Sequence, residues 1–148
     1  MRKSIFVGSL AFAVVGLAGC AGVGSNLSGS PGGQVSMGTH VKVTLVEYAV
    51  GANVREIPAG PVTFDVRNAG TLVHEMVVLE TSASDLTIGT DGKASEDSDG
   101  VKHVGEVNDL PVGKVQSVTL DLQPGTYLLI CNVPGHYHSG MYVKFVVR

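Results

Sequence analysis

Three residues near the C-terminus carry side chains that could bind a soft metal ion. In the stretch YLLICNVPGHYHSGMYVKFVV (127–147), four residues separate Cys131 from His136, and four more separate His136 from Met141. The pattern indicates an apolar strand, a short polar loop and a second strand, so both ends of the loop would be held by a rigid frame. Thiolate and thioether sulfur suit Cu(I), and imidazole suits both oxidation states of copper. The loop therefore predicts a copper site that lacks one ligand.

The missing ligand must come from another histidine. His74 lies in NAGTLVHEMVVLE, directly after a turn and at the start of an apolar strand. On the rim of a β-sandwich it could meet a ligand loop at the same end, although a half-buried strand histidine would give the same pattern. His40, beside the N-terminal segment, and His103, beside an acidic segment, are more simply interpreted as solvated. His138 competes with His136 for the same loop.

The elements that must position these ligands are short and β-branched. Six segments rich in Val, Thr, Tyr and Phe are separated by Gly/Pro turns and are predicted strands. They are residues 40–50, 60–68, 73–80, 115–122, 125–131 and 141–148. No window shows a useful helical stripe. The pattern predicts an all-β fold, a Greek-key β-sandwich, in a single domain over residues 40–148.

One segment interrupts this spacing. Residues 81–103 are polar and bring several acidic side chains close together, which could suggest a calcium loop. The acidic residues lack the regular spacing and the terminal Glu of an EF-hand. We therefore interpret the segment as a solvated, acidic loop insertion.

The N-terminus has the features of an export signal. MRKSIFVGSLAFAVVGLAGC contains two cations, an apolar stretch and small residues before Cys20, as in a secretory signal. Its last four residues resemble the lipobox at which bacterial lipoproteins are cleaved and acylated. We expect residues 1–19 to be a lipoprotein signal peptide, and residues 20–39 to be the lipidated cysteine and a flexible Gly/Ser-rich tether. An ordinary secretory signal is the alternative.

The number of cysteines bears on the same question. The chain has two, so a lipidated Cys20 would leave Cys131 without a disulfide partner in an oxidising compartment. The alternative is a disulfide between them, which would join a flexible tail to the end of a strand. A metal thiolate is the better explanation of Cys131.

Residues 40–148 resemble the cupredoxins, the small blue-copper family, and are most similar to the sulfocyanin, rusticyanin and auracyanin type. The resemblance is carried by CNVPGHYHSGM, which follows the pattern C-x4-H-x4-M with a PGH turn. It favours the histidine of that turn over His138. It implies a cupredoxin-type sandwich holding one type 1 copper ion, with four ligands: His74, Cys131, His136 and Met141.

Four further residues are expected in the second shell or at the electron port: Glu75, Asn132, Pro134 and Tyr137. Pro134 should stiffen the loop. Many cupredoxins have Asn or Ser after the first histidine, where this chain has Glu75. The Glu75 carboxylate could tie the two ligand segments together, point to solvent or bind copper as in red-copper relatives. Coordination is the least favoured of these because Met141 is present.

The resemblance implies a single-electron carrier and not an enzyme. Four protein ligands would leave no open position for a small-molecule substrate, and related oxidases need further copper centres. We expect a monomer at the periplasmic or extracytoplasmic face of a bacterial membrane, anchored through Cys20, with redox proteins as donor and acceptor. A module for copper holding or delivery is the alternative. The formal net charge of −3 and the lack of a basic patch argue against a nucleic-acid partner.

Overall fold

Alternating apolar residues form the strands of the computed structural model, which describes residues 38–148. In β1, Val41, Val43 and Leu45 are at most 1% exposed, while Lys42 and Thr44 between them face solvent. This alternation is expected for a strand with one face on the core. The expected signal peptide, Cys20 and most of the tether lie outside the described residues. The strands are β1 (Thr39–Val46), β2 (Ala49–Ala52), β3 (Glu56–Ile57), β4 (Gly60–Asn68), β5 (His74–Thr81), β6 (Val101–Leu110), β7 (Val115–Leu122), β8 (Gly125–Ile130) and β9 (Tyr142–Val147).

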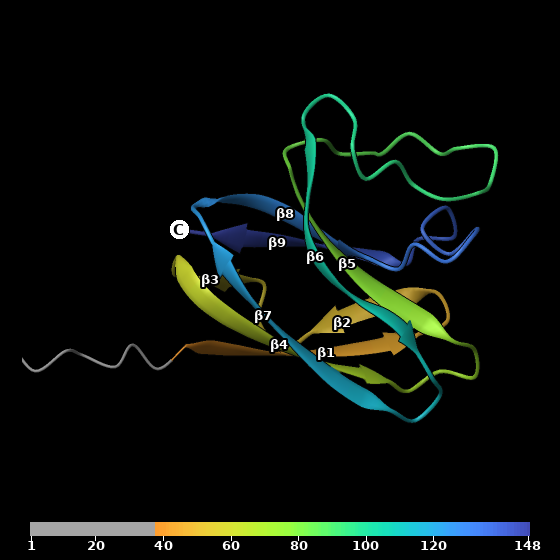
Figure 1. The fold of residues 1–148 in the computed structure, drawn as a ribbon, viewed down its shortest axis with the longest axis horizontal. Coiled ribbons are helices and arrows are strands. Elements are labelled where there is room, and N and C mark those ends of the chain that lie inside the picture. Colours follow the sequence, from red (N-terminus) through yellow and green to blue (C-terminus); the bar gives the residue numbers. More distant parts are fainter. Residues whose placement is uncertain (1–37) are drawn as a thin grey trace, which may run out of the picture. The chain divides into compact units, whose positions relative to one another are not determined.

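The strands form two sheets that enclose one main core (Figure 1). The first sheet has the order β2-β1-β4-β7, and the second has the order β3-β9-β8-β5-β6. Side chains from both sheets pack together in this core. The ring centroids of Phe64 and Phe145, for example, are 5.7 Å apart. This all-β, two-sheet sandwich in one domain confirms the fold class predicted from the sequence.

The strand predicted over residues 40–50 is divided by a turn. β1 and β2 pair antiparallel through Val46 and Ala49, so Glu47 and Tyr48 form the connection. The buried positions change parity at this point, from Leu45 to Val50. A continuous strand could not place both side chains on one face, which explains the break.

β6 is an edge strand of the second sheet that was not predicted from the sequence. It pairs antiparallel with β5 through a register interrupted by bulges between His74 and Met76 and between Val78 and Leu79. Only Val107 and Leu110 of β6 are fully buried. Bulges and an exposed edge disturb the alternation that identifies a strand.

The polar insertion is shorter than expected and is not simply solvated. β5 extends to Thr81 and β6 begins at Val101, so the irregular segment is 82–100. Its Leu86 and Ala94 are buried against the outer face of the second sheet. A second apolar cluster forms there, made of Val77, Leu79, Leu86, Ala94, Leu128, Ile130 and Tyr137. The interpretation as a solvated loop is therefore wrong for these residues, because alternate apolar side chains of β5 and β8 need a cover.

The predicted ligand segments lie at one end of the sandwich. The loop between β8 and β9 and the start of β5 are at the right of Figure 1, whereas β1 begins at the opposite end, near the C-terminus. Within residues 38–148, no helix has the length and apolar character needed to cross a membrane.

Candidate metal centre

Three of the predicted ligands converge at this end of the sandwich. His74 is the first residue of β5, Cys131 directly follows β8, and His136 lies on the loop before β9. The Cys131 Sγ atom is 3.3 Å from Nδ1 of His136 and 3.7 Å from Nδ1 of His74. One ligand atom from each residue lies within 4.8 Å of the other two. His74 and Cys131 are 0% exposed and His136 is 7% exposed, so the site is closed to bulk water.

Met141 is attached to the same loop through its backbone. The Cys131 N–H donates to the Met141 carbonyl at 3.0 Å, and the Met141 N–H donates to the His136 carbonyl at 3.1 Å. The Met141 side chain is fully buried in the main core cluster, which also contains Cys131. These bonds close the segment 131–141 into a compact loop.

Local backbone geometry explains the shape of the loop. Gly135 has a φ of +81°, and the His136 N–H donates to the Val133 carbonyl at 2.9 Å. A positive φ is readily accessible to glycine and costly for most other residues. Gly135 therefore allows the turn that directs His136 back toward Cys131.

The electrostatics of the pocket favour neutral ligands before metal binding. Burial raises the pKa of the Cys131 thiol, although backbone N–H groups of Glu75 and Val133 that point at the sulfur oppose this rise. Burial lowers the pKa of His136, and the neighbouring His74 lowers it further. A neutral His136 imidazole is ready to coordinate, and a bound metal would displace the Cys131 thiol proton. Two imidazoles, a thiolate and a thioether fit copper, because soft sulfur ligands suit Cu(I) while imidazole suits both oxidation states.

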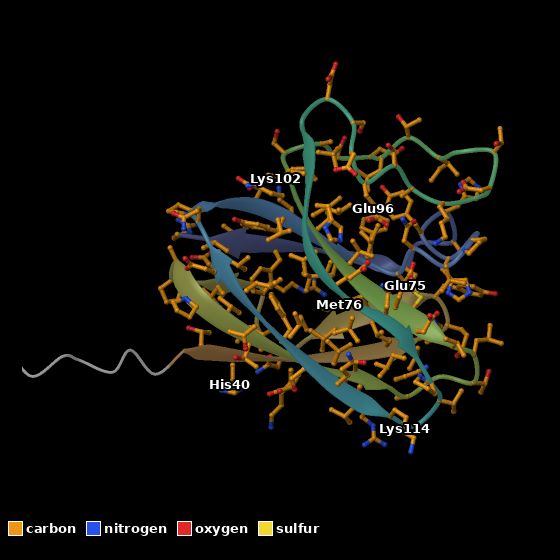
Figure 2. All side chains as sticks on the ribbon, in the orientation of Figure 1. His40, Glu75, Met76, Glu96, Lys102 and Lys114 are labelled. Atoms are coloured by element: carbon orange, nitrogen blue, oxygen red, sulfur yellow. The ribbon has the colours of Figure 1, made fainter. Side chains whose placement is uncertain are left out.

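Glu75 ties the ligand segments together through its backbone. Its N–H points at the Cys131 sulfur, while its largely buried carboxylate lies 4.0 Å from Lys93 Nζ. Burial raises the pKa of this carboxyl group. Its oxygens do not belong to the group of converging ligand atoms in the described residues. Figure 2 labels Glu75 on β5 and Glu96 on the insertion.

Asn132 and Tyr137 attach the ligand loop to the insertion. The Asn132 side chain accepts from the Ala94 N–H at 2.7 Å and donates to the Ala94 carbonyl at 2.9 Å and to Glu96 at 2.6 Å. The Tyr137 hydroxyl accepts from the Leu86 N–H at 3.0 Å. Tyr137 is therefore buried under the insertion and does not contribute to the exposed surface around His136, whereas Pro134 is exposed.

The β1–β2 turn contains two site residues that were not predicted from the sequence. The Tyr48 ring meets the His136 ring edge-on, with centroids 5.5 Å apart. Glu47 Oε1 lies 3.4 Å from Nε2 of His74. The apolar positions shift from odd to even residue numbers between Leu45 and Val50, and this shift could have predicted a turn. The sequence alone does not show at which end of the sandwich the turn lies.

The other histidines lie elsewhere. His138 is exposed, as expected for a neighbour of the ligand loop. His40 pairs with Asp65 at 3.2 Å near the start of β1, far from the ligand loop (Figure 2). His103 is partly buried between Glu96 and Glu106, with Nε2 3.7 Å and 3.6 Å from their carboxylates.

Comparison with known families identifies the chain. Residues 48–148 match the sulfocyanin (SoxE) domain. The chain belongs to the sulfocyanin family. The matched region contains all four predicted ligands, and it begins one residue after Glu47. A comparison of this sulfocyanin-family chain with curated proteins gives no match.

Solved structures support the same fold. Auracyanin B is 27% identical, with 74% of this chain and 88% of that chain covered and a TM-score of 0.58. Dithionite-reduced auracyanin from Roseiflexus castenholzii is 19% identical, with 74% and 97% covered and a TM-score of 0.54. Rusticyanin from Thiobacillus ferrooxidans is 20% identical, with 74% and 76% covered and a TM-score of 0.59. This sulfocyanin-family chain is thus a cupredoxin. His74, Cys131 and His136 converge as three ligands of a type 1 copper site, and Met141, the fourth ligand expected from the sequence, is buried in the core cluster that contains Cys131.

Proposed function

We propose that this protein is a single-electron carrier that uses one type 1 copper ion. The observation that carries the proposal is the convergence of His74, Cys131 and His136 in a buried pocket. Ligands that are already in place need to move little between the two oxidation states, which favours fast transfer. Rusticyanin is described as a copper protein, and both it and auracyanin have been studied in reduced form. These descriptions agree with a redox role and not with an enzyme.

The chain's own residues perform three tasks in this role. Copper supplies the one-electron chemistry when it is bound. The sandwich excludes water from Cys131 and His74, and the backbone N–H groups of Glu75 and Val133 stabilise charge on the sulfur. His136 retains a small exposed edge, and this edge is the proposed entry and exit point of the electron.

Exposed apolar residues lie next to two of the ligands, His136 and His74. Tyr48 contacts His136 and is 49% exposed, and Leu72 and Val73, directly before His74, are 46% and 47% exposed. A small apolar surface of this kind suits short-lived docking to a redox protein, since transient electron-transfer interfaces are small. We propose redox proteins as donor and acceptor on this basis.

We also propose that a lipid on Cys20 holds the carrier at the outer face of a bacterial membrane. The support is the lipobox-like sequence together with the position of β1, which begins at the end opposite the ligand loop. An anchor that reaches the domain at Thr39 would leave the copper end free to meet partners.

A redox-cycling experiment distinguishes a carrier from a copper-delivery module. The copper-loaded protein is reduced and reoxidised repeatedly in the presence of a Cu(I) chelator, and copper loss is measured after each cycle. A carrier keeps its copper and gives one reversible electron per ion. Rapid loss of Cu(I) to the chelator would contradict this role and favour delivery.

A further inference from the structure

The outer ring nitrogen of His74 is buried without a hydrogen bond. His74 is 0% exposed, and Nε2 is a fully buried side-chain nitrogen that finds no hydrogen-bond partner within residues 38–148. Its other ring nitrogen, Nδ1, faces Cys131 at 3.7 Å. If Nδ1 binds copper, Nε2 must carry the proton. A buried N–H without an acceptor is costly, so the site requires an acceptor at this position.

Glu47 is positioned to be that acceptor. Its Oε1 lies 3.4 Å from His74 Nε2, slightly longer than a hydrogen bond. The same oxygen accepts from the backbone N–H groups of Thr71 at 2.6 Å and Leu72 at 2.8 Å. These bonds fix the carboxylate against the segment that leads into β5. They also lower the pKa of Glu47 to about 2, so the carboxylate is ionised at neutral pH.

Gly70 leaves the space in which the two groups face each other. A Cβ atom at this position would lie 2.6 Å from Glu47 Oε1 and 2.7 Å from His74 Nε2. Such contacts are too short for either group to remain where it is. The Gly70 N–H is held by the side chain of Asn68 at 2.9 Å, so the close approach of this backbone is itself fixed. The turn is therefore built around the pair of Glu47 and His74.

Resting on the proposed copper function, we propose that Glu47 is a positioning residue that accepts a hydrogen bond from His74 Nε2–H in the metal-bound protein and lowers the reduction potential. A ligating histidine is commonly oriented by a carboxylate on its second nitrogen, which makes it a stronger donor. The negative charge also stabilises Cu(II) more than Cu(I), because the interaction scales with the charge of the ion. Glu47 lies outside the region that matches the family, so the family match does not account for it.

The first test compares the potentials of two charge-neutralising variants. Glu47→Gln keeps an oxygen acceptor but removes the charge, and we expect the affinity for Cu(II) relative to Cu(I) to fall about tenfold, the lower end of outer-shell effects. This change corresponds to a potential about 59 mV higher for a one-electron couple. The matched control is Glu80→Gln, which removes the same charge near the far end of β5, where Glu80 pairs with Lys102 at 3.2 Å. Glu80→Gln should change the reduction potential by only a small fraction of the shift expected for Glu47→Gln.

A second variant tests the contact without changing any charge. Gly70→Ala should break the contact between Glu47 and His74, because the added Cβ atom would lie too close to both groups for them to stay facing each other. We expect a higher potential than wild type. This variant also gives a result if Glu47→Gln fails to fold.

Nuclear magnetic resonance of the Cu(I) protein gives a readout that does not depend on electron transfer. In wild type the His74 Nε2 proton should exchange slowly and resonate far downfield, as expected for a hydrogen bond to a carboxylate. The resonance should move upfield in Glu47→Gln and Gly70→Ala, and it should stay in place in Glu80→Gln. The proposal about Glu47 alone would be overturned if the wild-type protein is blue but Glu47→Gln has no more effect than Glu80→Gln on the reduction potential and on the Nε2 proton resonance. A wild-type protein that forms no blue centre would overturn the copper function and this proposal together.

Discussion

At the scale of single residues, the chemistry of the site depends on how burial affects its donors. Cys131 is fully buried and burial raises the pKa of its thiol, while burial lowers the pKa of His136. In the metal-free protein at neutral pH the sulfur therefore keeps its proton and the His136 ring is neutral. Coordination must remove the thiol proton, and this links copper affinity to pH.

The apparent affinity for Cu(I) should therefore rise with pH. The thiol pKa lies above its usual value and the His136 pKa lies below its own, so from about pH 7 to 8 binding should release a proton from Cys131 and none from His136. Each pH unit should then increase the apparent affinity about tenfold. Competition with a chelator whose own pH dependence is known measures the slope, and an affinity that does not change with pH would show that no thiol proton is displaced.

Two substitutions of Met141 test whether this residue is the axial ligand of the copper ion. Thioether sulfur is a weak axial donor that tunes the potential in sites of this type. Met141→Leu should keep the blue colour and raise the potential, because loss of a donor destabilises Cu(II) more than Cu(I). Met141→Gln supplies a harder oxygen and should lower the potential.

Redox titration of both Met141 variants gives the sign of each shift. Leu is close to Met in volume, so Met141→Leu should cost less than about 1.5 kcal/mol of stability. If neither variant changes the potential, Met141 is only a core residue.

At the scale of elements, the insertion 82–100 braces the ligand loop. The Gly135 N–H donates to the Gly92 carbonyl at 2.9 Å, and Asn132 makes three hydrogen bonds to Ala94 and Glu96. Figure 1 shows the insertion extending toward the loop between β8 and β9. An acidic segment that looks solvated in sequence thus supports the residue next to the copper thiolate.

Removal of this brace should destabilise the fold. Asn132→Ala deletes three hydrogen bonds at a residue that is 1% exposed and leaves the Ala94 N–H without its acceptor. A buried unpaired group costs about 1–3 kcal/mol, so the free energy of unfolding should fall by at least that amount. Denaturant unfolding measures the change.

The matched control is Asn108→Ala, which removes an exposed hydrogen bond to Glu106. It should change the stability by no more than about 0.5 kcal/mol. Equal effects of the two variants would mean that the insertion does not brace the loop.

The features that could be predicted from the sequence are those that depend on residues close together in the chain. Cys131, His136 and Met141 lie within one loop, so their spacing could be read directly, and β4 and β7 alternate regularly enough to give their bounds correctly. β6 was missed because bulges and a solvent-facing edge disturb its pattern. Glu47 was missed because its role depends on the approach of the β1–β2 turn to the segment before β5. Glu47 and Thr71 are 24 residues apart in sequence, and no local pattern shows such a contact.

At the scale of the whole molecule, the proposed function would give the two ends of the sandwich different tasks. The ligand segments lie at one end, and β1 begins at the other. This arrangement suits a carrier that is attached at one end and docks with partners at the other. Attachment itself depends on Cys20, which lies outside the described residues.

Mutation of Cys20 tests the anchor. Cys20→Ala removes the acceptor of the lipid and should yield a soluble or unprocessed protein in place of an acylated, membrane-bound one. Cell fractionation and mass spectrometry of the mature N-terminus report the outcome. Normal acylation and membrane attachment of this variant would rule out the lipoprotein prediction.

The central claim is that Cys131 binds copper as a thiolate in a type 1 site. The most direct measurement is the visible absorption spectrum of the purified domain after addition of one equivalent of Cu(II), with Cys131→Ser as the matched control. We predict an intense blue thiolate-to-copper band in wild type and no such band in a Cys131→Ser protein that is still folded by circular dichroism. A wild-type spectrum without this band, or a band that persists in Cys131→Ser, would contradict the claim.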